Sequence, residues 1–129
     1  MIKTLLFKYR KLTVLLFVLV TIVILVGTLF PANSLSNINI WSYDKVAHLF
    51  AFAAWTFLFG VVRALWKQTK PNLFNVFALG LFYGLLIELF QFILPTNRSP
   101  ELYDFIADAL GSGLAVLLLK PIFKRMFEE

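Results

Sequence analysis

Long uncharged or nearly uncharged runs limit this chain to folds that can sit in a lipid bilayer. The first run, residues 12–30, has 19 residues without a charge and ends before Pro31. A helix needs about 20 apolar residues to cross a hydrocarbon core of about 30 Å. Three more apolar runs follow, at residues 46–62, 73–94 and 102–119. We therefore predict a single all-α membrane domain over residues 1–129, an antiparallel bundle of four transmembrane helices.

Composition supports the membrane class over a soluble domain. Hydrophobic residues make up 60% of the chain and the mean hydropathy is +0.85, whereas soluble domains are near half apolar. A cleaved signal peptide is the alternative for the first run, and residues 32–34 (Ala-Asn-Ser) keep it open. Its apolar region would be about 7–15 residues, so we favour an uncleaved first span.

Basic residues predict the orientation of the bundle. All but two of the 12 Lys and Arg residues lie before the first run, between the second and third, or after the fourth. The exceptions are Lys45 and Arg98. Because positive loops stay cytoplasmic, we expect both termini inside and the loops at 31–43 and 95–102 outside.

Ionisable and polar residues collect near the outer ends of the predicted spans. Glu88 and Gln91 are three apart, and Asp104 and Asp108 are four apart, so each pair shares a helix face. Such residues are costly at membrane depth and tend to be paired, turned inward and functional. The topology predicts one inward-facing cluster of seven side chains: Asp44, His48, Glu88, Gln91, Arg98, Asp104 and Asp108.

Each candidate residue could have a chemical role or a structural role. His48, four residues after Asp44, is a candidate base or metal ligand oriented by that carboxylate, or a hydrogen bond between helices. Asp44, His48 and Glu88 are the acid–base candidates, whereas Glu88 could instead form an ion pair with Arg98 or Lys45.

The polar positions predicted to bind a ligand are Gln91, Arg98, Asp104 and Asp108. Arg98 can grip a phosphate or carboxylate, or pair with Glu101 in the loop. Asp104 and Asp108 resemble a hard-cation site, although Asp104 also suits a helix N-terminus. Glu88, Asp104 and Asp108 are the metal candidates, but neither a metal nor another cofactor is identified.

Two glycines and the lack of cysteine also bear on packing and chemistry. Gly111 and Gly113 are expected to allow close helix packing. The chain has no Cys, which excludes a disulfide framework and a cysteine nucleophile.

The order and spacing of these residues resemble a known family. Asp44-Lys45-x-x-His48, Glu88-x-x-Gln91, Arg98 and Asp104-x-x-x-Asp108-x-x-Gly111 are similar to motifs of the VanZ-like family of small bacterial membrane proteins, over about residues 40–115. One departure is Asp108, where the family pattern often has Asn. The resemblance implies a multi-pass protein of the bacterial cytoplasmic membrane, linked to cell-envelope chemistry and, in the name-giving member, to glycopeptide (teicoplanin) resistance.

These observations leave two function classes. The first is a polar pocket on the outer leaflet that binds or processes an envelope lipid, a lipid-linked amphiphile or a glycopeptide-related ligand. The second is a non-catalytic binding or interaction protein whose polar cluster is structural. A proton-coupled carrier is disfavoured by four short spans without a repeat, and a nucleic-acid partner by basic loops that flank membrane spans. Whether a reaction is catalysed stays open.

Overall fold

The structure is a computed structural model that describes residues 1–29, 41–95 and 100–128, with side chains from Lys45 onward in the second range. Every regular element in these ranges is a helix, which confirms the predicted fold class. The elements are α1 (Ile2–Lys8), α2 (Arg10–Leu29), α3 (Trp41–Lys67), α4 (Leu73–Ile93) and α5 (Leu102–Phe127).

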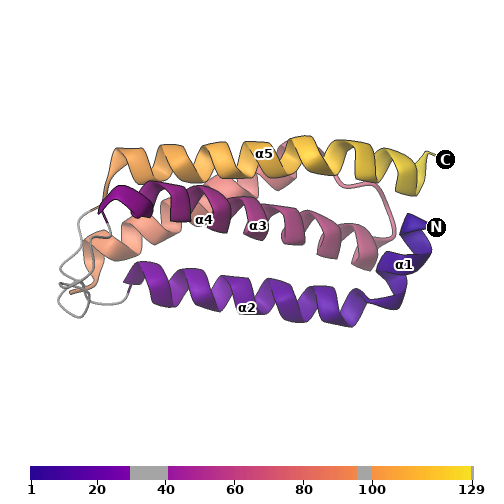
Figure 1. The fold of residues 1–129 in the computed structure, drawn as a ribbon, viewed down its shortest axis with the longest axis horizontal. Coiled ribbons are helices and arrows are strands. Elements are labelled where there is room, and N and C mark those ends of the chain that lie inside the picture. The colour runs from indigo at the N-terminus through magenta and orange to yellow at the C-terminus, as the bar shows by residue number, and fades with distance from the viewer. Residues whose placement is uncertain (30–40, 96–99, 129) are drawn as a thin grey trace.

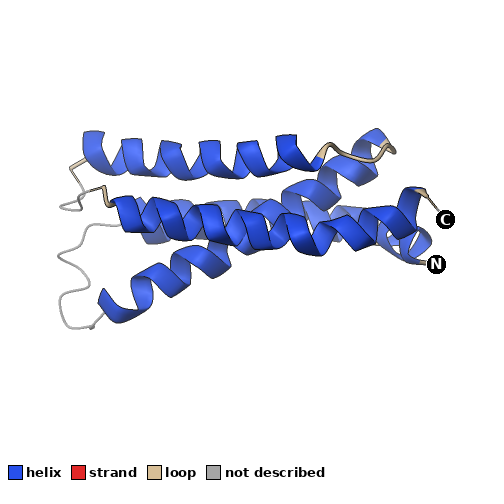
Figure 2. Cartoon of the chain, turned by 90° about the horizontal axis from the view of Figure 1, so that it is seen from above, coloured by secondary structure: helices blue, strands red, loops and turns tan. Residues whose placement is uncertain are grey.

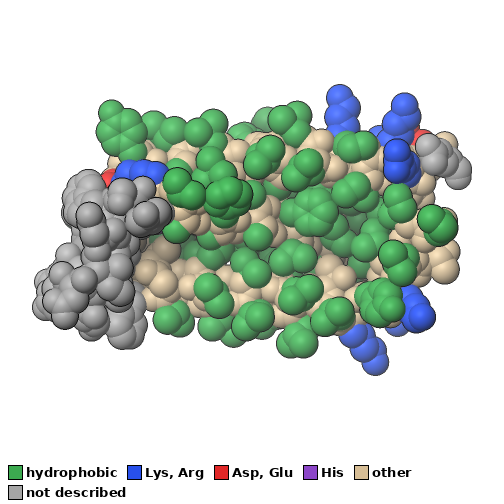
Figure 3. All heavy atoms as spheres, in the orientation of Figure 1, with side chains coloured by type: hydrophobic (Ala, Val, Ile, Leu, Met, Phe, Trp, Pro, Cys, Tyr) green, Lys and Arg blue, Asp and Glu red, His purple; other side chains and the backbone are tan. Residues whose placement is uncertain are grey.

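The four long helices run side by side as an antiparallel bundle (Figures 1 and 2). Each of α2 to α5 contains a segment long and apolar enough to cross a membrane. The two termini and the α3–α4 connection lie at one end of the bundle, and this end is called the terminal end below. Hydrophobic side chains cover the visible flank, and basic side chains gather at the terminal end (Figure 3). This distribution matches a multi-pass membrane protein.

Several helices extend beyond their predicted bounds. The second span was expected at 46–62, but α3 continues to Lys67, and the fourth was expected at 102–119, but α5 continues to Phe127. Pro121 lies inside α5, where it removes a backbone hydrogen bond. Phe123 and Met126 are buried in the bundle, so apolar packing offsets the lost bond and keeps the last turns helical.

Local chemistry sets both ends of α4. The Asn72 side chain caps the first turn, because its Oδ1 accepts from the backbone N–H of Phe74 at 2.9 Å. At the other end Leu94 adopts an extended conformation just before Pro95, as residues before a proline tend to do. The α4 helix is therefore held to one membrane-spanning length.

The most extensive helix pair in the bundle is α3 with α5. Their backbones approach so closely at Gly111 that an added Cβ would lie 2.1 Å from the Leu49 carbonyl oxygen. Gly113 is different, since its nearest neighbour would be the Phe77 ring at 3.7 Å, an ordinary contact. The expected close packing therefore depends on Gly111 and does not extend to Gly113.

Two apolar clusters fill the bundle. One lies toward the terminal end, where Ile2 and Leu6 of α1 pack against it. Its buried members, called the apolar floor below, are Val61, Ala64, Leu65, Val76, Leu119, Phe123 and Met126. The other joins α2 to α3 and α4 through Ile24, Phe52, Trp55 and Ile87.

Candidate functional site

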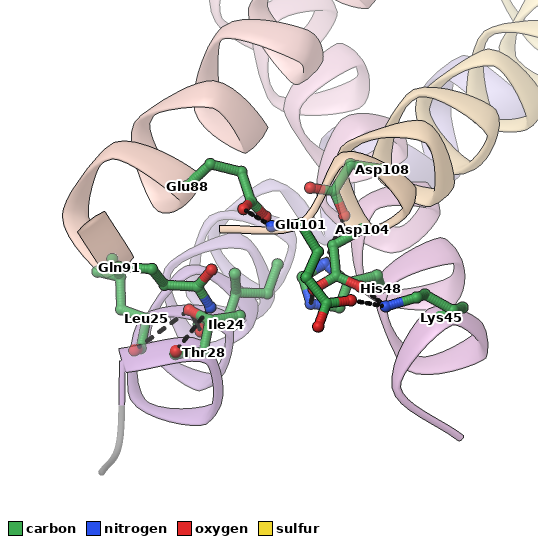
Figure 4. A network of polar contacts seen from close by, with 10 residues as sticks. All are labelled: Ile24, Leu25, Thr28, Lys45, His48, Glu88, Gln91, Glu101, Asp104 and Asp108. Atoms are coloured by element: carbon green, nitrogen blue, oxygen red, sulfur yellow. Dashed lines mark hydrogen bonds and ion pairs between the residues drawn. The ribbon is translucent and has the colours of Figure 1, made fainter. Parts of the chain in front are cut away.

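A buried histidine bound to a carboxylate lies between α3 and α5 (Figure 4). His48 is near the N-terminal end of α3, which lies at the end of the bundle opposite the chain termini (Figure 1). His48 Nδ1 lies 2.7 Å from Asp108 Oδ1. His48 Nε2 lies 3.8 Å from Asp104 Oδ2, which is too long for a hydrogen bond. His48 is 4% exposed and Asp108 is fully buried. Because Asp104 and Asp108 share a face of α5, the two carboxylates flank the ring.

Lys45 places a positive charge close to the His48–Asp108 pair, on the side nearer the N-terminal ends of α3 and α5. Its ammonium hydrogen-bonds both Glu101 Oε2 and Asp104 Oδ1, and so links the N-terminal parts of α3 and α5. Neither Lys45 nor Glu101 was among the predicted site residues. The signal available for Lys45 was its position three residues before His48, on the same helix face.

Glu88 and Gln91 of α4 form the other side of the site. Glu88 Oε2 accepts the backbone N–H of Glu101 at 3.0 Å, and Gln91 Nε2 donates to the carbonyl of Thr28 in α2 at 3.0 Å. Both side chains are buried, at 7% and 3% exposed. Within the described residues, neither Glu88 Oε1 nor Gln91 Oε1 has a hydrogen-bond partner. The α4 side of the site therefore has acceptor capacity that the described residues do not use.

Polar contacts between α3 and α5 continue from His48–Asp108 to Thr56–Ser112, and these two pairs are called the polar seam below. Phe52 stacks parallel to the His48 ring, with 6.3 Å between centroids. Deeper still, Thr56 of α3 and Ser112 of α5 share a hydrogen bond of 2.8 Å. A Cβ on Gly80 of α4 would lie 2.6 Å from both hydroxyl oxygens, so α4 covers the seam closely at this level. Beyond it lies the apolar floor.

Hydrogen bonds also attach the peripheral helix α2 to the core. Trp55 Nε1 donates to Thr21 Oγ1 at 2.9 Å, and the Tyr83 hydroxyl donates to the Thr21 carbonyl at 3.2 Å. Sequence reasoning did not select these residues, since aromatic side chains in an apolar run also suit lipid contact. They hold α2 beside Gln91 and so help to shape the site.

The predicted cluster is only partly assembled by the described residues. His48 meets Asp104 and Asp108, while Glu88 and Gln91 lie across from them on α4. Arg98 and the side chain of Asp44 lie outside the described residues, so their pairing with Glu88 and His48 stays a prediction. The carboxylate observed on His48 Nδ1 belongs to Asp108.

The described residues include one arrangement that is known from acid–base sites. Across the part of the chain that the structure describes, no group of three or more His, Asp or Glu side chains is arranged to hold a metal ion. A carboxylate on Nδ1 fixes the orientation of an imidazole and stabilises its protonated form, as in general-base sites. His48 and Asp108 have this arrangement.

Comparison with known proteins gives the chain its family. Uncharacterized protein C11E3.10 of Schizosaccharomyces pombe is 37% identical over 86 residues, which are 67% of this chain and 52% of that protein. The chain thus spans about half the length of this relative, which comes from a yeast rather than a bacterium. No solved structure matches the chain. The VanZ/LLP1 family model matches residues 3–124, and the chain therefore belongs to the VanZ/LLP1 family.

Proposed function

We propose that this protein binds an envelope lipid or lipid-linked amphiphile at the polar end of its bundle, in the outer leaflet of a bacterial cytoplasmic membrane. The observation that carries the proposal is the pair of acceptors on α4, Glu88 Oε1 and Gln91 Oε1. A buried polar atom without a partner costs about 1–3 kcal/mol. Hydroxyl or amine groups of a ligand head group would satisfy both atoms, while the apolar bundle surface suits its hydrocarbon chain.

Acid–base processing of that ligand is the catalytic extension of the proposal. His48 is held by Asp108 and lies across the site from Glu88. In this proposal His48 takes up or delivers a proton at the head group, with Asp44 and Glu88 as further acid–base groups. Arg98 holds an anionic part of the ligand, and Gln91, Asp104 and Asp108 shape its binding site. Glycopeptide susceptibility is the phenotype that the family resemblance suggests.

One specific observation favours the structural alternative. Lys45 binds both Glu101 and Asp104, and His48 contacts Asp108, so side chains of α3 and α5 satisfy one another in this half of the cluster. In that case the cluster holds two helices together as the Thr56–Ser112 pair does. The alternative therefore predicts that mutations in the His48–Asp108 pair and in the Thr56–Ser112 pair have similar effects.

His48→Gln and Thr56→Val separate the two readings. Glutamine can still donate to Asp108 but cannot titrate near neutral pH, whereas Thr56→Val removes a polar link between the same two helices. We expect both variants to insert and to melt near the wild-type temperature, because a single interhelical hydrogen bond in a membrane contributes only about 0.6 kcal/mol on average. We expect wild-type expression to confer teicoplanin resistance, and only His48→Gln should abolish it.

The measurements are melting curves in detergent beside teicoplanin susceptibility of expressing strains. Asp44→Asn should weaken the phenotype less than His48→Gln, because it removes only a neighbouring charge. Full resistance in a stable His48→Gln strain would contradict the acid–base role. Equal loss of stability and phenotype in both variants would favour the structural alternative.

A further inference from the structure

A groove lies between α3 and α4 toward the terminal end, away from the site above. It has a volume of about 410 Å³ and is lined by Arg63, Asn75, Val76, Ala78, Leu79 and Phe82. This volume falls within the range of about 300–1,000 Å³ that is typical of small-molecule sites. The groove therefore has room for part of a lipid.

The α4 wall of the groove is apolar and follows one helix face. Val76, Leu79 and Phe82 are spaced three residues apart, so they line up along the helix. Val76 is fully buried and forms the bottom, while Leu79 and Phe82 are 42% and 55% exposed. These side chains offer a track for a hydrocarbon chain that starts near the α4 N-terminus and runs toward the middle of the bundle.

A charged group and an amide stand at the polar end of this track. Arg63 lies one turn before the end of α3, and Asn75 is the third residue of α4. Both side chains are exposed. Within the described residues, no hydrogen bond or ion pair involves the Arg63 guanidinium. A guanidinium donates paired hydrogen bonds to phosphate oxygens, and an amide N–H₂ can add another.

We propose that this groove is a binding site for one anionic phospholipid, with the phosphate at Arg63 and Asn75 and an acyl chain along Val76, Leu79 and Phe82. Charge complementarity selects the lipid over other occupants of an apolar groove. A second copy of the chain would bring another apolar helix face against Arg63 and leave its charge buried, which costs several kcal/mol per unpaired ion. A phospholipid supplies a counter-charge and a hydrocarbon chain in one molecule.

Native mass spectrometry with added lipid tests the site directly. We expect the full chain to retain one phosphatidylglycerol more strongly than phosphatidylcholine. Arg63→Gln should weaken phosphatidylglycerol retention about tenfold or more, since it removes the charged hydrogen bonds to the phosphate. The matched control is Arg125→Gln, which removes the same charge from an exposed position at the same end of the bundle and should retain the lipid as wild type does.

A second variant tests the apolar half of the groove. Ala78→Trp fills the groove and keeps Arg63, so it should also lose phosphatidylglycerol. Wild-type retention in Arg63→Gln or in Ala78→Trp would overturn the proposal. Equal loss of phosphatidylglycerol in Arg63→Gln and Arg125→Gln would also overturn it, because lipid binding would then depend on the overall positive charge of the terminal end. Retention of both lipids alike by the wild type would overturn it as well, because charge complementarity is what selects an anionic lipid.

Discussion

At the scale of single residues, the site depends on how side chains from different helices divide their hydrogen bonds. Glu88 uses one oxygen for the backbone N–H of Glu101. Gln91 uses its N–H₂ for the Thr28 carbonyl. Each thereby presents its other oxygen in a buried place, where an added donor has its largest effect because water does not compete.

A double-mutant cycle tests the predicted pairing of Glu88 with Arg98. If Glu88 pairs with Arg98 rather than with a ligand, Glu88→Gln and Arg98→Gln should each lower stability or phenotype, and the double variant should lose less than their sum, with a coupling of about 0.5–3 kcal/mol. The measurement is melting in detergent with the phenotype assay. Glu88→Gln combined with Lys70→Gln is the control, because Lys70 binds Glu128 at the terminal end and distant losses add within about 0.5 kcal/mol. Additive losses for the first pair would show that Glu88 and Arg98 do not interact.

Sequence periodicity anticipated the contacts within a helix better than those between helices. The spacing of Asp104 and Asp108 predicted their shared face, and both flank His48. The same rule assigned Asp44 to orient His48, which stays a prediction because the Asp44 side chain lies outside the described residues. It gave no reason to expect Asp108 of another helix on His48 Nδ1. It gave no reason for Gln91 to turn toward α2. These partners depend on helix rotation and depth, which sequence spacing does not set.

At the scale of helices, the α3–α5 contact places the two halves of the polar seam. The Gly111 backbone lies against the Leu49 carbonyl. Leu49 is one residue after His48, and Gly111 is three residues after Asp108. Close backbone approach through small residues is a common basis of helix pairing in membranes. The histidine and its carboxylate therefore meet because Gly111, about one turn after Asp108, lets α5 approach α3 beside His48.

Substitution of that glycine should separate the helices. Gly111→Ala places a Cβ 2.1 Å from the Leu49 carbonyl oxygen, and since backbone must move, we expect a loss of about 1–3 kcal/mol or more. Gly113→Ala is the matched control in the same helix, with its nearest contact at 3.7 Å. It should be neutral or slightly stabilising, because alanine favours helix by up to about 1 kcal/mol over glycine. Melting curves in detergent measure both, and equal melting of the two variants would contradict the close-contact role.

Hydrophobic run length predicted the four long helices but not their ends. The first span was expected at residues 12–30 and α2 is Arg10–Leu29, a close agreement. The additional turns of α3 and α5 contain basic residues, which an apolar-run criterion excludes, although helices continue readily through Lys and Arg. The short helix α1 was not anticipated, because it is held by its contacts with the apolar floor.

At the scale of the whole molecule, the bundle has two chemically different ends. The terminal end carries the described basic residues except Lys45, and the other end carries the described acids except Glu128. Positive loops that stay cytoplasmic would place the termini inside and the polar cluster outside. This orientation stays a prediction.

Single cysteines can test the orientation without background, because the chain has no native Cys. Ser36→Cys and Asn97→Cys should react with an impermeant maleimide on intact cells. Thr69→Cys, in the α3–α4 connection, should react only after the membrane is opened. Labelling of Thr69→Cys on intact cells, or protection of the other two, would reverse the predicted topology.

The apolar floor also determines how the site responds to the electric field of the membrane. His48 lies three residues into the α3 span, only about 5 Å along the helix at 1.5 Å per residue. Moving one elementary charge through a whole membrane changes its energy by about 2.3 kcal/mol per 100 mV. Most of the membrane potential falls across the apolar remainder of the bundle. A proton that reaches His48 from the polar end therefore crosses only a small share of the potential. The proton transfer that we propose for His48 would then run at nearly the same rate in energised and depolarised cells.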